Sequence, residues 1–204
     1  MPSLSLDISE EEIIRLLQEY PHQNPEENYR EQIFNELARP AAVLVPLLRK
    51  PQEWHILFTR RTDTLPEHSG QVAFPGGQCD PSDQSPEDTA LREAYEEIRL
   101  HPADVKILGR LNTLITITNY SVTPVVGSIP QPYDFVIAER EVSRVFTIPL
   151  AWLADPTNRE IRKRILPPPL KPTPIIYFKP YEGEVLWGVS AQIVLDLLKA
   201  LRLF

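Results

Sequence analysis

Residues 74–98 read FPGGQCDPSDQSPEDTALREAYEEI, and this stretch decides the expected fold. A short apolar segment, predicted as a strand from Gln71 to Phe74, stops at Pro75 and the glycines that follow it. A polar, acidic loop comes next, and Ser85 then offers an N-cap with Pro86 at the first helical position. The stretch therefore predicts a strand, a glycine turn, a loop and a capped helix that runs to about residue 98.

The predicted helix has an apolar face and an acidic face. The apolar residues lie at helical spacing: Leu91, Ala94, Tyr95 and Ile98. Glu93 and Glu97 are four residues apart and Glu96 is three from Glu93, so like charges are crowded together. A bound divalent cation would relieve that repulsion, and Mg²⁺ and Mn²⁺ prefer oxygen ligands. An acidic face is also the ordinary appearance of a solvated helix, but the preceding Gly76-Gly77 favours a metal site because glycines let backbone approach a ligand closely.

The rest of the chain predicts short strands around a few helices. Ser9 and Glu12 form a capping-box pattern at the start of a helix over 7–20. The closing residues 190–203 predict an amphipathic helix. Further strands are predicted at 41–48, 54–59, 105–111, 122–129, 175–178 and 184–187, with the first two and the last two as hairpins. This order predicts an α+β fold, a single-domain α/β/α sandwich with a mixed sheet.

Composition excludes several classes of protein. The 204 residues carry a net charge of −7, from 28 acidic and 21 basic side chains, which argues against binding nucleic acid by neutralising phosphates. An anionic substrate is still compatible, because divalent ions can supply positive charge. The single cysteine, Cys79, excludes an intrachain disulfide. The chain shows neither a secretory signal nor an apolar run of roughly 18 residues, so we expect a cytoplasmic protein without a membrane partner.

The residues from Gly77 to Leu100 resemble the Nudix box, in which a glycine and a loop glutamate precede Arg-Glu-x-x-Glu-Glu-x-Gly. The match comprises Arg92, Glu93, Glu96 and Glu97. The upstream segments LFTRR at 57–61 and HSGQVAFPGG at 68–77 are similar to the longer signature of the coenzyme A pyrophosphatase branch. The resemblance covers about residues 41–198, and implies a Nudix-like domain over 31–204 behind an N-terminal helical extension over 1–30.

The chain departs from the family pattern in three places. The loop before the helix is one residue longer than in the general box, as is common in that branch, and Asp83 stands near the expected glutamate. Arg99 replaces the glycine that usually ends the helix, so we expect a different helix end because a left-handed cap is harder for arginine. Pro66 stands where the branch usually has arginine, which bears on binding of a substrate phosphate.

The resemblance implies a role for each matched residue. Glu93 and Glu97 correspond to ligands of Mg²⁺ or Mn²⁺, with Glu96 as a third ligand or outer partner and the Gly77 carbonyl as a further ligand. Arg92 would orient these carboxylates through charge-assisted hydrogen bonds. The bound ions would bridge a diphosphate and activate water.

Other candidates lie outside the helix. Glu141 is our candidate general base, although a solvated loop carboxylate is an equal alternative. Arg60 and Arg61 are candidates for binding the diphosphate or a 3′-phosphate, and only one of them is expected to face the site because neighbouring side chains on a strand alternate. His68 is a candidate phosphate donor or a structural loop residue. Gly76 is expected to let backbone approach the substrate.

Three functions compete. The first is hydrolysis of coenzyme A or acyl-coenzyme A to 3′,5′-ADP and (acyl-)4′-phosphopantetheine. The second keeps the chemistry and changes the substrate to ADP-ribose or another nucleoside diphosphate linked to a second group. The third is a non-catalytic nucleotide-sensing domain, which ranks last because Glu93, Glu96 and Glu97 are all present. All three imply a small-molecule ligand and no nucleic acid, and they leave a homodimer open.

Overall fold

The computed structural model describes residues 8–21, 38–51, 53–64, 69–164 and 173–204. Its α-helices are α1 Glu10–Glu19, α3 Pro86–Ile98, α4 Leu150–Ala154 and α5 Gly188–Ala200. Its strands are β1 Arg39–Lys50, β2 Glu53–Arg61, β3 Val72–Ala73, β4 Gly76–Gln78, β5 Lys106–Arg110, β6 Leu114–Ile115, β7 Tyr120–Ile129, β8 Val142–Pro149, β9 Arg159–Arg164 and β10 Thr173–Phe178. Short 3₁₀ turns occupy Pro102–Asp104 and Pro156–Asn158.

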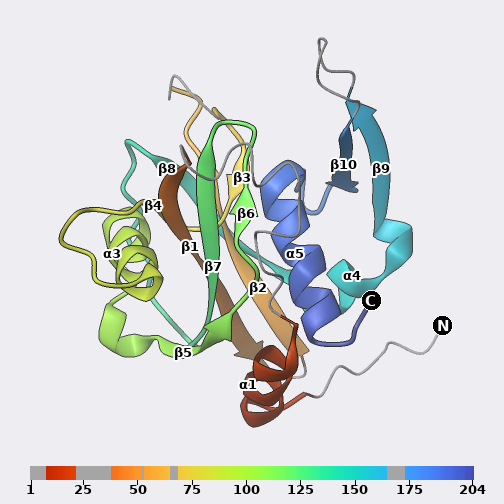
Figure 1. The fold of residues 1–204 in the computed structure, drawn as a ribbon, viewed down its shortest axis with the longest axis horizontal. Helices are drawn as coiled ribbons and strands as arrows, with labels where there is room; N and C mark the ends of the chain where they lie inside the picture. The colour runs from red at the N-terminus through yellow and green to blue at the C-terminus, as the bar shows by residue number, and fades with distance from the viewer. Residues whose placement is uncertain (1–7, 22–37, 52, 65–68, 165–172) are drawn as a thin grey trace.

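The central sheet is mixed. Its main path runs β3-β2-β1-β7-β5, while β4 pairs with β1, β6 with β7, and β8 with β2. β1 and β7 are parallel, whereas β1 forms the predicted antiparallel hairpin with β2. Helix α3 lies on one side of this sheet, and α1 and α5 lie on the other (Figure 1). The predicted α+β sandwich with a mixed sheet is confirmed.

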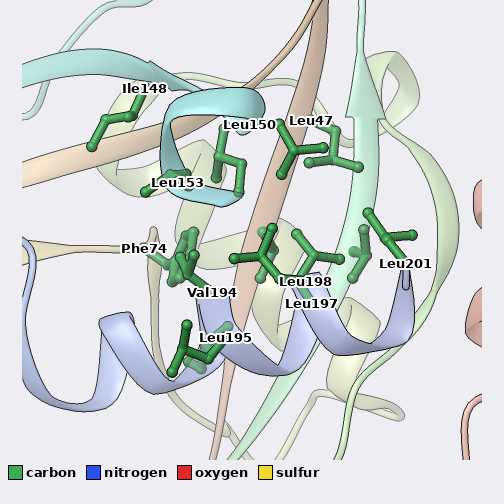
Figure 2. Close-up of a cluster of buried hydrophobic side chains, with 14 of the residues drawn as sticks. Leu47, Phe74, Ile148, Leu150, Leu153, Val194, Leu195, Leu197, Leu198 and Leu201 are labelled. Atoms are coloured by element: carbon green, nitrogen blue, oxygen red, sulfur yellow. The ribbon is translucent and has the colours of Figure 1, made fainter. Parts of the chain in front are cut away.

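Alternation along β1 produces the two cores. Ala42, Leu44 and Leu48 point to the side of α3, and pack with the buried face of that helix. Val45 and Leu47 point to the other side, toward α5 and α1. The larger core gathers leucines of α5 against Phe74, Ile148 and the short helix α4 (Figure 2). Both faces of β1 are therefore buried, as expected for a strand at the centre of a sandwich.

The N-terminal helix packs on the second face. The Ser9 hydroxyl accepts a hydrogen bond from the Glu12 N–H at 3.2 Å, as the capping pattern predicts. Ile13, Leu16 and Leu17 are buried in the same core as α5. The predicted boundary between an extension and a domain, at residues 30 and 31, lies outside the described residues. Within those residues, no helix is long and apolar enough to cross a membrane.

Two strand predictions were wrong. The glycine turn after Phe74 was not expected to pair, yet Gly76–Gln78 forms β4 against β1 because these glycines fit closely against the β1 backbone. The principal partner of β10 is β9, which was not predicted, and the expected partner contributes only a bridge from Tyr177 to Trp187. Trp187 is half-buried and stacks on Tyr177 with ring centroids 5.4 Å apart. The proline-rich stretch 167–174, which the sequence predicts to be extended, lies mostly outside the described residues.

Candidate active site

Helix α3 begins as its sequence predicts. The Ser85 hydroxyl accepts a hydrogen bond from the Asp88 N–H at 3.2 Å, and Pro86 occupies the first turn. Ala90, Ala94 and Ile98 are fully buried against the sheet. Burial of this face fixes the rotation of the helix, so that Glu93 and Glu97 are turned toward β4 rather than into solvent.

The glycine pair in β4 allows this strand to lie close to the acidic face of α3. A Cβ atom on Gly77 would lie 2.5 Å from Glu93 Oε1, so no side chain fits there without moving that carboxylate. A Cβ atom on Gly76 would lie 2.5 Å from the Ala42 carbonyl oxygen, which is backbone and cannot yield easily. The two glycines therefore allow the chain to run between β1 and the acidic face of α3.

Glu97 is a buried carboxylate at the centre of this site. Its exposed fraction is 4%, and its Oε2 atom has no hydrogen-bond partner among the described residues. Burial raises the pKa of the Glu97 carboxyl to about 8. The negative charges of Glu93 and Glu141 act in the same direction, whereas Arg61 and the N–H of Gly76 oppose it. The positive charge that the described part of the chain places near Glu97 is therefore too small to hold this carboxyl ionised at neutral pH.

Glu93 lies in the same environment. Burial raises the pKa of its carboxyl, and the charges of Glu96 and Glu141 raise that pKa as well. Arg92 acts against this shift through a hydrogen bond from Nη1 to Glu93 Oε1 at 2.8 Å. Glu93, Glu97 and Glu141, which come from two separate segments of the chain, thus influence one another electrostatically, and we call them the acidic cluster.

Arg92 ties the helix to the loop before it. Its Nε and Nη2 atoms donate to the two carboxylate oxygens of Asp83, at 3.1 and 2.9 Å. Nη2 also donates to the Gln78 carbonyl oxygen at 3.1 Å. The Asp83 carboxylate further accepts the Thr89 hydroxyl at 2.8 Å, and the pKa of Asp83 is held well below its usual range chiefly by Arg92. Asp83 was noted in the sequence only for its place in the loop, and this bidentate contact gives it a positioning role.

The segment that carries Glu141 is fastened to the end of α3. The Ala138 N–H donates to the Glu97 carbonyl oxygen at 2.8 Å, and the Val136 N–H donates to that of Ile98 at 3.2 Å. The Thr62 N–H donates to the Glu141 carbonyl oxygen at 3.0 Å. The backbone of this segment therefore uses the last free carbonyls of the helix, and this brings Glu141 close to Glu97.

Our expectation for the end of α3 was wrong. Arg99 adopts the left-handed conformation, with φ 54° and ψ 30°, although its side chain disfavours it. Its N–H donates to the carbonyls of Ala94 and Tyr95, and its guanidinium lies over the Tyr95 ring at 5.1 Å. The Tyr133 hydroxyl donates to the Arg99 carbonyl at 3.4 Å. These contacts hold the cap in the absence of glycine.

The two arginines at the end of β2 have different surroundings. Arg60 donates to Asp63 Oδ1 at 2.8 Å and to the Ser143 hydroxyl at 3.1 Å, and lies 3.5 Å from Glu184. Arg61 instead acts electrostatically on Glu97. The alternation expected from the sequence is therefore present. His68 and Pro66 lie outside the described residues.

The donor set suits a divalent ion that keeps water or phosphate ligands. Within the described ranges, no three acidic, histidine or cysteine side chains converge closely enough to hold a metal ion alone. Glu96 is 57% exposed and its carboxylate lies 3.5 Å from Arg92 Nη1. Two carboxylates remain beside β4: Glu93 lies next to Gly77, and Glu97 interacts with the Gly76 N–H. Mg²⁺ is commonly held by one or two carboxylates together with waters and substrate phosphates, so the residues fit such an ion.

Comparison with known proteins gives the family. The model of the NUDIX domain matches residues 38–167. An uncharacterised Nudix hydrolase NudL from Yersinia pestis is 39% identical over 164 residues, which cover 79% of each chain. The C. elegans Ap4A hydrolase in a binary complex covers 54% of this chain and 80% of its own, with 22% identity and a TM-score of 0.47. A MutT/nudix family protein from Enterococcus faecalis covers 79% of this chain and 61% of its own, with 14% identity and a TM-score of 0.49.

The matches to the NUDIX domain and to NudL, in a chain with a mixed-sheet sandwich and an acidic helix, give a hydrolase of the diphosphatase class. The chain belongs to the Nudix hydrolase family. Members of this family are pyrophosphatases of nucleoside diphosphate derivatives, and they generally use divalent metal ions such as Mg²⁺ or Mn²⁺.

Proposed function

We propose that this protein hydrolyses the diphosphate of coenzyme A or acyl-coenzyme A. Water attacks one phosphorus, the bridging P–O bond breaks, and the products are 3′,5′-ADP and (acyl-)4′-phosphopantetheine. The observation that carries the hydrolytic function is the buried Glu97 carboxylate, which is influenced by the charges of Glu93 and Glu141 and has an oxygen that lacks a partner among the described residues. The choice of coenzyme A is supported by the segments at 57–61 and 68–77, which resemble the signature of that branch.

In this proposal, Glu93 and Glu97 hold Mg²⁺ or Mn²⁺, with the Gly77 carbonyl as a further ligand and Glu96 as a third carboxylate or outer partner. When bound, the ion neutralises the diphosphate and lowers the pKa of water. Support comes from the pKa of about 8 for the metal-free Glu97 carboxyl, because a cation would remove the cost of ionising it.

The remaining site residues position groups or move a proton. Arg92, held by Asp83, keeps the Glu93 carboxylate in place through the 2.8 Å hydrogen bond from Nη1. Glu141 is proposed as the general base that accepts a proton from the attacking water. Its support is the fastening of residues 136–141 to the end of α3, which brings this carboxylate within electrostatic reach of Glu93 and Glu97.

The decisive experiment compares substrates at equal concentration. The purified protein is incubated with Mg²⁺ and either coenzyme A or ADP-ribose, and the products are separated by liquid chromatography. We expect 3′,5′-ADP and 4′-phosphopantetheine from coenzyme A, no turnover with EDTA, and slower cleavage of ADP-ribose. Faster cleavage of ADP-ribose would overturn the assignment to coenzyme A, and failure to cleave either diphosphate would overturn the catalytic function.

Several expectations accompany this function without bearing on the site. The net charge of −7 predicts that nucleic acid is not a partner. Two further statements stay predictions from the sequence: the protein is cytoplasmic, and it has no membrane partner. The sequence also leaves open whether it forms a homodimer. The division into residues 1–30 and 31–204 is likewise a prediction.

A further inference from the structure

Arg61 occupies the last position of β2, where the pairing with β8 is irregular. Arg60 pairs with Arg144 and Arg61 pairs with Val142, so Ser143 is an extra residue on β8. The Ser143 hydroxyl lies 3.1 Å from the Arg60 carbonyl oxygen and 3.4 Å from that of Arg61. Such a bulge redirects the strand locally, and here it places the end of β2 next to Glu141, whose carbonyl accepts the Thr62 N–H.

One polar atom of the Arg61 side chain is not used by the described part of the chain. Its Nε atom is buried and has no hydrogen-bond partner among the described residues, and the same holds for Glu97 Oε2. No carboxylate in the described part of the chain forms an ion pair with Arg61. A buried polar atom without a partner is costly, so such atoms often mark a place where a ligand or water completes the bonding.

The other two arginines discussed above, Arg60 and Arg92, have partners for their guanidinium groups. Arg92 is engaged by Asp83 and Glu93, and Arg60 by Asp63 and Ser143. Of these three arginines, Arg61 is therefore the one whose guanidinium can offer donors to an anion beside the acidic cluster. A planar guanidinium suits a phosphate because two of its N–H groups can donate to two phosphate oxygens at once.

We propose that Arg61, and not Arg60, binds the diphosphate of the substrate beside Glu97, and that the Ser143 bulge aims it there. This inference rests on the proposed function, because it presupposes a diphosphate at the acidic cluster. It assigns Arg61 to the group that all candidate substrates share, rather than to the 3′-phosphate that distinguishes coenzyme A.

The first test measures binding without turnover. Calorimetry with methylenediphosphonate and Mg²⁺ is compared for the wild type, Arg61→Gln and Arg61→Lys. Loss of a charge-assisted phosphate contact is expected to weaken binding by about 10- to 100-fold in Arg61→Gln, and less in Arg61→Lys, which keeps the charge. Arg144→Gln is the matched control, because Arg144 lies on the neighbouring strand and pairs with Glu182 and Glu184.

Binding of Mn²⁺ alone separates an electrostatic role from a structural one. Removing a positive charge near Glu97 should tighten Mn²⁺ binding by about twofold or more in Arg61→Gln, because the charge repels the ion. A variant that is merely misfolded would bind both Mn²⁺ and methylenediphosphonate more weakly. Unchanged affinity for methylenediphosphonate in Arg61→Gln, or weaker Mn²⁺ binding in both Arg61 variants, would overturn the inference.

The second test compares coenzyme A with its 3′-dephospho form. We expect Arg61→Gln to lower kcat/KM by the same factor for both substrates, because both carry the diphosphate. A loss confined to coenzyme A would assign Arg61 to the 3′-phosphate and overturn the inference. If the wild type neither binds Mn²⁺ nor cleaves any diphosphate, the proposed function itself fails. If it does both and Arg61→Gln behaves like the wild type, only the inference fails.

Discussion

The guanidinium of Arg92 joins two carboxylates that lie on different segments, Asp83 in the loop and Glu93 on the helix. Its Nη1 atom donates to Glu93 Oε1 at 2.8 Å, while Nε and Nη2 donate to both oxygens of Asp83. The position of Glu93 therefore depends on a residue of the preceding loop. Charge-assisted hydrogen bonds of this bidentate kind hold geometry well, which suits a carboxylate that must meet a cation.

Replacing Asp83 with asparagine tests this dependence. The amide keeps an acceptor oxygen and loses the charge, so Arg92 should be held less firmly. We expect kcat to fall by about 10- to 100-fold, as is usual for partners of metal-binding side chains. The free energy of unfolding should fall by about 1–3 kcal/mol, because the Asp83 side chain is only 6% exposed. Steady-state kinetics and urea unfolding measure the two effects.

Asp88→Asn is the control for that variant, because the Asp88 side chain is exposed and, among the described residues, accepts a hydrogen bond from the Gln84 N–H without contacting Arg92 or Glu93. It should leave kcat within about twofold of the wild type, as expected of a surface substitution. Equal kcat in Asp83→Asn and the wild type would show that Glu93 does not need this support.

The two glycines of β4 predict different consequences for the same substitution. In Gly77→Ala the new methyl group would meet the Glu93 carboxylate, the mobile end of a side chain, so the carboxylate should move while the fold persists. We expect activity to fall by at least about tenfold with a loss of less than about 1 kcal/mol in stability. In Gly76→Ala the methyl group would meet the backbone of Ala42 and Val43, so unfolding should become easier by roughly 2 kcal/mol or more. Equal loss of stability in both variants would contradict this distinction.

Glu97→Gln tests the proposed metal ligand directly. The amide is nearly the same size, but it cannot supply a negative charge to Mg²⁺. We expect turnover to fall by at least about 100-fold while the circular dichroism spectrum stays that of the wild type. Glu139→Gln, at an exposed position two residues before Glu141, is the control and should keep full turnover. Magnesium-dependent turnover at the wild-type rate in Glu97→Gln would remove the assignment.

The same residue predicts how the stability of the metal-free protein depends on pH. The unfolded chain releases the Glu97 proton near the ordinary value of 4.5, whereas the folded protein holds it until about pH 8. Between these values the folded state binds more protons, so the free energy of unfolding should decrease as pH rises from about 5 to about 8. The loss attributable to Glu97 should be on the order of a few kcal/mol.

Urea unfolding in EDTA at several pH values measures this slope. Glu97→Gln should flatten it, and should be more stable than the wild type at pH 8 and above in the absence of metal. Addition of Mn²⁺ should restore stability to the wild type at high pH, because the ion binds the ionised carboxylate. A slope that is identical in the wild type and Glu97→Gln would show that the residue does not hold its proton in the fold.

Sequence patterns predicted the elements whose signals are local. The N-cap at Ser85 and the apolar spacing of α3 act within a few residues, and the hairpin of β1 and β2 follows from its short turn. Strand β4 was missed because glycines have low strand propensity and its pairing depends on β1. Strand β9 was missed because Arg159–Arg164 has little apolar alternation, so only its pairing with β10 defines it.

In the site, too, the sequence predicted what depends on local spacing and missed what depends on contacts between distant segments. The spacing of Glu93 and Glu97 on one helix places both on one face, and strand alternation correctly separates Arg60 from Arg61. The approach of Glu141 depends on backbone hydrogen bonds from residues 136 and 138 to the end of α3, for which no local pattern exists. The contact of Asp83 with Arg92 depends on the path of the loop, and a carboxylate in a polar loop carries no signal of its partner.

Arg99→Gly tests the cap at the end of α3. Arg99 has φ 54°, a conformation that costs an L-residue about 1 kcal/mol relative to glycine, so the substitution should relieve strain. It also removes the contact of the guanidinium with the Tyr95 ring, which at an exposed site contributes about 0.5–1 kcal/mol. We therefore expect the free energy of unfolding to change by less than about 1 kcal/mol.

Activity should also be retained in Arg99→Gly, because the hydrogen bonds that fasten residues 136–141 use the carbonyls of Glu97 and Ile98 rather than the side chain of Arg99. Arg99→Val provides the contrast, since a β-branched residue tolerates the left-handed conformation least and should destabilise the cap. If Arg99→Val lowers stability and kcat together while Arg99→Gly lowers neither, the backbone geometry of the cap positions Glu141. If Arg99→Gly lowers kcat to the level of Arg99→Val, the guanidinium itself is required, and the backbone geometry of the cap is not sufficient to position Glu141.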